Sequence, residues 1–199
     1  MGTVIASATV SLDGFVAYPD NTPGELFDWY ESGDVEVEHL GDFPSFRLTP
    51  QSAAYWREFT GSLGALVVGR TLFDITDGWR GQHPLGVPVV VVTHEPPIDW
   101  SYPGSENFHF VTTGIEDAIA RAQQIAGHKA VAVAAGTIAS QALAAGLLDE
   151  VAMDLVPVLL GAGVPYFIDL PTVTVMLGDP TVVVQGNRVT HLKFPVLRG

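Results

Sequence analysis

Four segments of the chain place glycine or polar residues directly after a hydrophobic run that is typical of a β-strand. They are residues 11–14, 69–71, 93–94 and 135–138. In an α/β protein with parallel strands, ligands bind beyond the carboxyl ends of the strands. This rule singles out the four segments as candidate ligand-binding positions.

The last segment contains Ala135, Gly136, Thr137 and Ile138 and leads almost directly into a predicted helix. The first turn of a helix has unpaired backbone N–H groups and the positive end of the helix dipole, which suit a phosphate or pyrophosphate. Gly136 has no Cβ to keep such a ligand away from the main chain. The alternative is that Gly136 only permits a tight turn and that Thr137 caps the helix.

Arg70 stands between Gly69 and Thr71 and is one of only nine basic residues in the chain. At a junction between strand and helix, its guanidinium would give a phosphate a charge-assisted hydrogen bond. The alternative is an ordinary salt bridge on the surface.

The elements that would position these residues follow from the hydrophobic pattern. Thr113 and Glu116 predict a capping box at the start of the clearest helix. Strand and helix patterns alternate through the middle of the chain, and two or three strands alone close it. This order predicts a single α/β domain over residues 1–199, with a central, mostly parallel sheet, flanking helices and an antiparallel C-terminal edge. The expected strands include residues 3–12, 63–68, 87–93, 108–112, 130–135 and 150–156, and the expected helices include residues 51–60, 114–126 and 137–145.

Residues 13–50 differ in composition from the rest of the chain. They hold nine carboxylates and no basic residue before Arg47. This composition predicts a solvated loop region with at most one short helix. The alternative is a surface that binds a partner.

The overall composition excludes several classes of function. With 22 acidic against 9 basic residues, the formal charge of −13 argues against binding to nucleic acid or to anionic membranes. The absence of cysteine excludes disulfides, zinc–thiolate sites and a catalytic thiol, and the six histidines lack metal-ligand spacing, so no metal site is predicted. The longest uncharged stretch, residues 130–148, contains polar groups that fit a strand, a turn and a helix better than a membrane span. We therefore expect a cytoplasmic protein that acts on a small molecule.

Four segments, taken in order, resemble the dihydrofolate reductase-like superfamily. They are residues 4–17, 67–74, 133–150 and 156–167. The resemblance is closest to the reductase (C-terminal) domain of the bifunctional riboflavin-biosynthesis deaminase–reductase and its stand-alone relatives, and it covers nearly the whole chain. It implies a dihydrofolate reductase-like fold that binds NADPH in an extended form and is often assembled as a homodimer.

The resemblance also implies which residues contact each part of NADPH. By this resemblance, the adenosine 2′-phosphate end of NADPH would be contacted by Gly69, Arg70 and Thr71, and the adenosine by Thr93 and His94. The pyrophosphate would be bound by the backbone N–H groups of Gly136, Thr137 and Ile138, next to Ala135. Thr9, Val16 and Ala17 would flank the nicotinamide, with Asp13 at the rim of the substrate pocket and the loop of residues 159–163 closing over the same region.

Two departures from the family pattern bear on the substrate. Folate reductases carry a carboxylate on the first helix, and the matching position here is Ala53, so efficient dihydrofolate reduction is not expected. Phe15 stands where riboflavin-pathway reductases usually have a basic residue, which weakens the expectation of a ribose-phosphate substrate.

The leading hypothesis is an NADPH-dependent oxidoreductase that acts on a small organic substrate and resembles 5-amino-6-(5-phosphoribosylamino)uracil reductase. Asp13 is the candidate catalytic residue, either orienting the substrate or relaying a proton, and the alternative role for it is to cap a turn before Gly14. The alternative function is a nucleotide-binding or structural module of the same fold without turnover.

Overall fold

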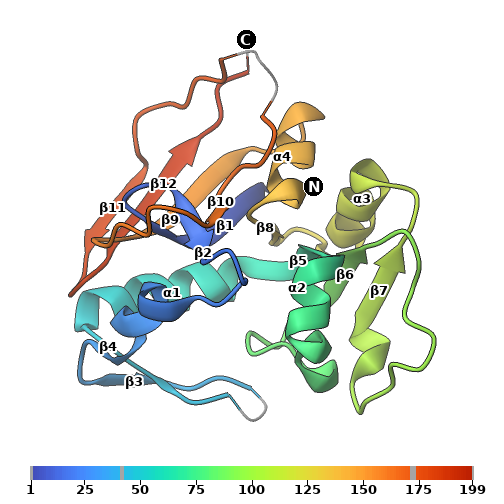
Figure 1. Cartoon of the computed structure of the whole chain (residues 1–199), viewed down its shortest axis with the longest axis horizontal. Coiled ribbons are helices and arrows are strands. Elements are labelled where there is room, and N and C mark those ends of the chain that lie inside the picture. The colour runs from blue at the N-terminus through green and yellow to red at the C-terminus, as the bar shows by residue number, and fades with distance from the viewer. Residues whose placement is uncertain (1, 41–42, 171–173, 199) are drawn as a thin grey trace.

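An eight-stranded sheet runs through the computed structural model, which describes residues 2–40, 43–170 and 174–198 (Figure 1). The strand order is β11-β12-β9-β1-β8-β5-β6-β7. The six strands from β9 to β7 are parallel, and β12 and β11 add an antiparallel edge at the C-terminal side. The predicted α/β class and sheet arrangement are confirmed. The strands are β1 (Val4–Ser11), β5 (Leu63–Gly69), β6 (Val89–Val92), β7 (Phe108–Val111), β8 (Ala130–Ala134), β9 (Glu150–Val156), β11 (Val182–Gln185) and β12 (Thr190–Pro195).

Helices cover the two faces of this sheet. One face packs against α3 (Ile115–Ala126) and α4 (Thr137–Ala144), through alternate residues of the central strands such as Ala6, Val67 and Val133. The opposite face packs against α2 (Arg70–Ile75) over β5 and β6, and against α1 (Pro50–Ser62) near the C-terminal strands. Unbroken runs of β-branched residues such as β6 suit strands that are covered on both faces.

The strand register decides which polar residues share the face covered by α1. Thr9 of β1 is paired with Asp154 of β9, and Asp154 with His191 of β12. Register partners on neighbouring strands point to the same side of a sheet. These three side chains therefore form a polar row that α1 covers.

Residues 13–50, which hold the nine carboxylates, contain more secondary structure than the sequence predicts. Beyond β2 (Phe15–Ala17) and the 3-10 helix η1 (Gly24–Glu31), it contains a hairpin of β3 (Val35–Val37) and β4 (Phe46–Leu48). The predicted short helix is confirmed by η1, but the prediction that the rest is a solvated loop is wrong, because Leu26, Trp29 and Leu48 are fully buried against α1 and complete a third hydrophobic cluster. Figure 1 shows the hairpin beneath α1. One of the nine carboxylates, Asp42, lies outside the described residues.

The predicted capping box of Thr113 and Glu116 is also wrong. The N-cap of α3 is Gly114, whose φ of 109° lies in a region that favours glycine, and no side chain in the described part of the chain caps this helix. Short elements complete the structure: β10 (Val164–Pro165), which pairs with β2, and the 3-10 helices η2 (Asp77–Gly81) and η3 (Ser105–Asn107). Among the helices of the described ranges, none has the length and apolar character needed to cross a bilayer.

Candidate functional site

The four candidate segments follow four strands that are consecutive in the sheet. Residues 11–14 follow β1, residues 135–138 follow β8, residues 69–71 follow β5 and residues 93–94 follow β6. All four strands are parallel, so these segments lie along one edge of the sheet. A Cβ on Gly69 would come within 3.0 Å of Ile138 Cγ1, which shows how closely residues 69–71 and residues 135–138 approach each other.

The start of α4 has the open main chain that an anion requires. Gly136, with φ of 86°, is the N-cap, and neither Thr137 nor any other side chain of the described residues caps the helix. A Cβ at Gly136 would meet only Ile168 Cδ1, at 3.7 Å. The Gly136 N–H donates to the Tyr166 carbonyl (2.7 Å), so this amide is already occupied. The Thr137 and Ile138 amides have no partner among the described residues and remain for a ligand.

Ser140 fixes this helix start against the chain that passes beside it. Its hydroxyl donates to the Gly136 carbonyl (3.1 Å) and accepts from the Ile168 N–H (2.7 Å). Together with the Gly136–Tyr166 hydrogen bond, this arrangement holds the first turn of α4 in place before any ligand arrives.

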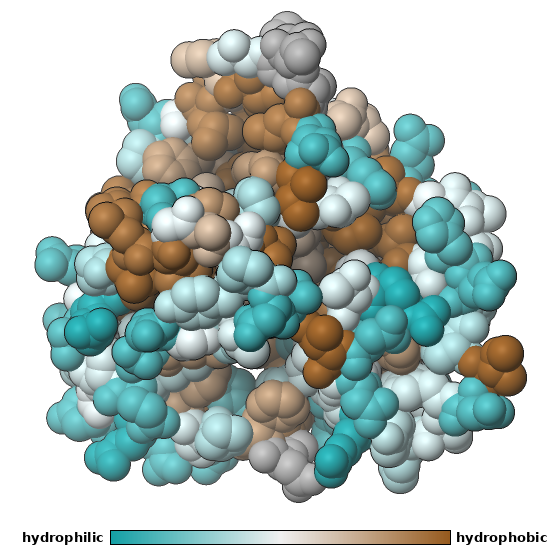
Figure 2. Space-filling model, in the orientation of Figure 1, coloured by the Kyte–Doolittle hydropathy of each residue, from teal (hydrophilic) through white to brown (hydrophobic). Residues whose placement is uncertain are grey.

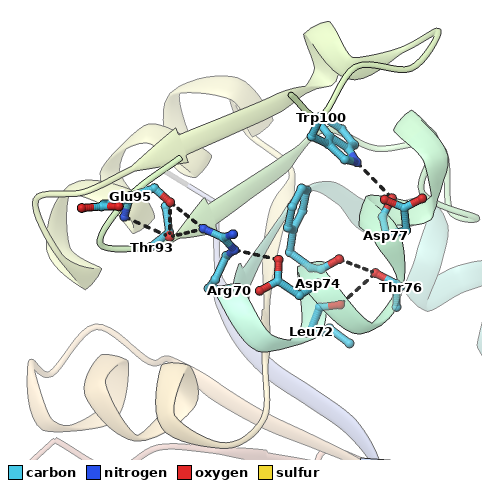
Figure 3. A network of polar contacts seen from close by, with 9 residues as sticks. Arg70, Leu72, Asp74, Thr76, Asp77, Thr93, Glu95 and Trp100 are labelled. Carbon is cyan, nitrogen blue, oxygen red and sulfur yellow. Dashed lines mark hydrogen bonds and ion pairs between the residues drawn. The ribbon is translucent and has the colours of Figure 1, made fainter. Parts of the chain in front are cut away.

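Arg70 joins the ends of two strands, as Figure 3 shows. Its Nη1 donates to the Glu95 carbonyl (2.6 Å) and to Thr93 Oγ1 (3.3 Å), beyond β6, and its Nε donates to Asp74 Oδ1 (2.7 Å) on α2. The salt bridge expected as an alternative is therefore present. Nη2 makes no hydrogen bond to the described residues, so the guanidinium still has donors for a phosphate. Thr71 and His94 are exposed beside it, and Thr93 is buried.

Asp13 holds a neighbouring loop. Its carboxylate accepts from the Ser11 hydroxyl (2.6 Å) and from the backbone N–H groups of Leu160 (3.2 Å) and Gly161 (2.7 Å). The hydrogen bond from Ser11, with those from Gly161 and Leu160, lowers the pKa of Asp13 below its ordinary range. The group is therefore ionised at neutral pH, which favours positioning of residues 159–163 over a proton-donating role. Val16 and Ala17, on β2 beside this loop, are half-buried.

A buried row of hydrogen-bonded polar side chains lies under α1, and it was not among the site residues predicted from the sequence. His191 Nδ1 is 2.6 Å from Asp154 Oδ1, and His191 Nε2 is 2.9 Å from Ser52 Oγ. His191 and Ser52 are at most 1% exposed and Asp154 is 8% exposed. Tyr55 stacks on the imidazole with ring centroids 4.4 Å apart. The one available signal was a carboxylate in β9 at a position where alternation requires an inward side chain.

The donors along the strand ends fit the phosphates of an extended dinucleotide. Two free amides and an open glycine stand at one point, and a guanidinium stands at another, on neighbouring strand ends. In the described ranges, no group of three or more His, Asp or Glu side chains could hold a metal ion.

Comparison with known proteins agrees with this fold. A family model described as the RibD C-terminal domain matches residues 2–191. A solved protein from Shewanella sp. PV-4, described as a riboflavin biosynthesis protein, is 22% identical with a TM-score of 0.68, and the match covers 100% of both chains. Among curated proteins, no match was found.

Two further solved structures share the fold at lower identity. Dihydrofolate reductase from Enterococcus faecalis, complexed with NADP(H) and RAB-propyl, is 15% identical with a TM-score of 0.60, and the match covers 99% of this chain and 98% of that one. The diaminohydroxyphosphoribosylaminopyrimidine deaminase/5-amino-6-(5-phosphoribosylamino)uracil reductase from Thermotoga maritima is 13% identical with a TM-score of 0.63. That match covers 98% of this chain and 57% of the Thermotoga chain. On the match over residues 2–191, the chain belongs to the RibD C-terminal domain family and is a reductase with the dihydrofolate reductase-like fold.

Proposed function

We propose that this reductase uses NADPH to reduce a C=N or C=O bond of a small organic substrate, with 5-amino-6-(5-phosphoribosylamino)uracil as the first candidate. The observation that carries the proposal is the close approach of Gly69 to Ile138. This approach brings the guanidinium of Arg70 and the free amides of α4 to the same edge of the sheet. One elongated ligand with two separate phosphate positions would satisfy both.

Each implied residue has a role that its position supports. Arg70 Nη2 would bind the 2′-phosphate, and the Thr137 and Ile138 amides would bind the pyrophosphate. The nicotinamide would lie near Thr9, Val16 and Ala17, beneath the loop that Asp13 holds. When bound, NADPH would supply the hydride, while the protein supplies orientation and a local field.

A nucleotide-binding module without turnover is the second candidate, and one observation favours it. Ala53, at the position of the folate-reductase carboxylate, is 1% exposed inside a hydrophobic cluster. The first helix therefore offers no acid at this position. Such a module would bind NADPH but would not oxidise it with any substrate.

We also propose that the protein is a cytoplasmic homodimer. Several large apolar side chains near the C-terminal strands are exposed, among them Val183 and Met176. Figure 2 shows hydrophobic residues gathered at the upper left, where Figure 1 places β11 and β12. A second copy of a chain with a charge of −13 would approach most readily through such an uncharged surface.

Titration with NADPH and NADH, followed by quenching of tryptophan fluorescence, tests the cofactor. We expect saturable binding of NADPH, and we expect Arg70→Gln to weaken it about 10- to 100-fold, since hydrogen bonds to charged groups contribute about 1.5–3 kcal/mol. NADH affinity should change little in this variant because NADH lacks the 2′-phosphate. Arg121→Gln, an exposed arginine on α3, is the matched control. A wild-type protein that shows no saturable binding would disprove the proposal.

A further inference from the structure

We propose that Asp154 is the acid of this active site, and that His191 and Ser52 are positioning residues that hold it. In this proposal β9 supplies the carboxyl group that the first helix lacks, and Asp154 delivers the proton that accompanies the hydride. The inference rests on the proposed function, because it assigns a role in that same reaction.

The three residues form a continuous chain of hydrogen bonds across three elements. Asp154 is on β9, His191 on β12 and Ser52 in the first turn of α1. The distances along the chain are 2.6 Å and 2.9 Å. Buried polar groups of this kind are costly unless they are satisfied, and each end of the imidazole has a partner here.

Of the three hydrogen-bonded side chains, only Asp154 can exchange a proton with solvent. The side chain of Asp154 is 11% exposed, whereas that of His191 is 0% exposed. Asp154 Oδ1 bonds to His191, and Oδ2 makes no hydrogen bond within the described part of the chain and is not among its buried atoms without a partner. Oδ2 is therefore the oxygen that a substrate could reach.

The accessible end lies on the face of the sheet where the nicotinamide is expected. Asp154 is the register partner of Thr9, which is one of the residues implied to flank the nicotinamide. Both side chains lie near the carboxyl ends of parallel strands, where ligands bind in such sheets. The carboxyl group is thus placed next to the expected position of the reacting bond.

Ser52 cannot act as a nucleophile, although serine, histidine and aspartate also occur together in hydrolases. Ser52 is 1% exposed, and a Cβ on Gly186 in the turn between β11 and β12 would collide with its Oγ. No substrate could approach this hydroxyl. Its role is limited to the hydrogen bond with His191 Nε2.

The three hydrogen-bonded side chains can hold a proton without any movement of their heavy atoms. With Asp154 protonated on Oδ2 and His191 neutral, Nδ1–H donates to Oδ1 and the Ser52 hydroxyl donates to Nε2. After Asp154 loses its proton, the same Nδ1–H stabilises the carboxylate. If His191 then gains a proton, Nε2–H donates to Ser52 Oγ. Every state keeps its hydrogen bonds.

The proton from Asp154 completes the reduction of the substrate. When bound, NADPH would supply the hydride that adds to the carbon of the C=N or C=O bond and would itself leave as NADP⁺, and the electron pair of that bond would move to the nitrogen or oxygen. That atom takes the proton from Asp154 Oδ2, so the substrate is reduced by two electrons and gains two hydrogens. Solvent returns a proton to Asp154 through its exposed edge.

The titratable groups that face Asp154 come from four elements. They are His191 on β12, Tyr30 on η1, Tyr55 on α1 and Tyr166 beyond β10. Burial, followed by the negative charge of Asp154, raises the pKa of all three tyrosines above their ordinary value of 10.0. The tyrosines therefore stay neutral near neutral pH.

The test compares NADPH oxidation by the wild type, Asp154→Asn, His191→Gln and Ser52→Ala across the neutral pH range. The probe substrates are 5-amino-6-(5-phosphoribosylamino)uracil and dihydrofolate. Glu150→Gln is the matched control, because it makes the same change from carboxylate to amide at the other end of β9. NADPH affinity is measured by fluorescence for every variant, which separates cofactor binding from turnover.

We expect Asp154→Asn to bind NADPH as the wild type does and to lose about 10²- to 10⁴-fold in kcat, the usual contribution of a general acid. Ser52→Ala should lose less and should shift the pH profile, because only the far hydrogen bond of His191 is removed. This variant keeps the proposal testable if Asp154→Asn does not fold. Glu150→Gln should behave as the wild type.

Two results would overturn the inference, and they can be told apart. If the wild type oxidises NADPH with a probe while Asp154→Asn keeps its kcat, or while Ser52→Ala keeps the wild-type pH profile, the inference alone is wrong. If the wild type binds no NADPH, or oxidises it with neither probe, the proposed function fails and this inference falls with it.

Discussion

Asp13 holds the loop of residues 159–163 at the rim of the site, because its carboxylate accepts hydrogen bonds from two backbone amides of that loop. We expect Asp13→Asn to loosen residues 159–163 and to lower stability at neutral pH, because an amide oxygen is a weaker acceptor than a carboxylate. The folded pKa of Asp13 lies below the ordinary value of 3.8, so its contribution is fully present above pH 3.8 and is lost as the pH falls through the lower folded value. The difference from the wild type should therefore disappear in acid.

Hydrogen exchange at the Leu160 and Gly161 amides, with urea unfolding at neutral pH and below pH 3.8, measures both effects. Asp20→Asn is the control, because among the described residues that carboxylate bonds only to Thr22 in its own turn. Unchanged exchange at Leu160 and Gly161 in Asp13→Asn would show that another contact holds the loop.

The residues of the site differ in how far the sequence could identify them. Gly136 and Arg70 are recognisable because each follows a strand directly, and a strand end is a local feature. Ser52 and Asp154 lie 139 and 37 positions, respectively, before His191 in the chain. Only the pairing of β9 with β12 and the docking of α1 bring them together, so a pattern within a short window could not reveal them.

The start of α4 is the element on which cofactor binding depends most. We expect Ser140→Ala to destabilise the protein by about 1–3 kcal/mol, because the Ile168 N–H would lose its buried partner. NADPH affinity should also fall, since the first turn of α4 would lose its tie to the neighbouring chain. Urea unfolding and fluorescence titration measure the two effects.

Ser62→Ala provides the comparison for Ser140→Ala. Ser62 is exposed at the end of α1, and its hydroxyl bonds only within its own helix in the part of the chain that the structure describes. Its loss should therefore change stability by less than about 0.5 kcal/mol. Equal stability of the two variants would mean that the Ile168 N–H finds another acceptor.

Elements with a strong hydrophobic period were predictable, and short elements in an acidic context were not. Thirteen-residue α1 and the valine strand β6 carry their signal in their own sequence. The strands β3 and β4 have three residues each, and nine carboxylates between residues 13 and 50 concealed the inward positions of Val37 and Leu48. The turn from Asp77 to Arg80 has positive φ at four consecutive residues, and only the glycine among them indicates such a conformation.

For the molecule as a whole, the sheet is covered unevenly. α3 packs on β5, β6 and β8, and α4 packs on β5 and β8, whereas no helix of the described residues makes extensive contact with the same face of β11 and β12. Val183 of β11 is in register with Leu192 of β12, and Leu192 is in register with Met153 of β9. These three side chains form an apolar row, and Val183 is 62% exposed at its end.

We expect this row to lie in the interface of the proposed homodimer, so Val183→Asp should yield monomers. In a two-fold interface each copy presents the same patch, so a single substitution places two carboxylates in a surface that excludes water. Light scattering during gel filtration measures the mass, and NADPH titration checks that each protomer still binds cofactor. Ile98→Asp is the control, because Ile98 is 96% exposed in the connection between β6 and β7, far along the sheet from β11. A wild type that is monomeric at every concentration, or a Val183→Asp variant that stays dimeric, would exclude this face as the interface.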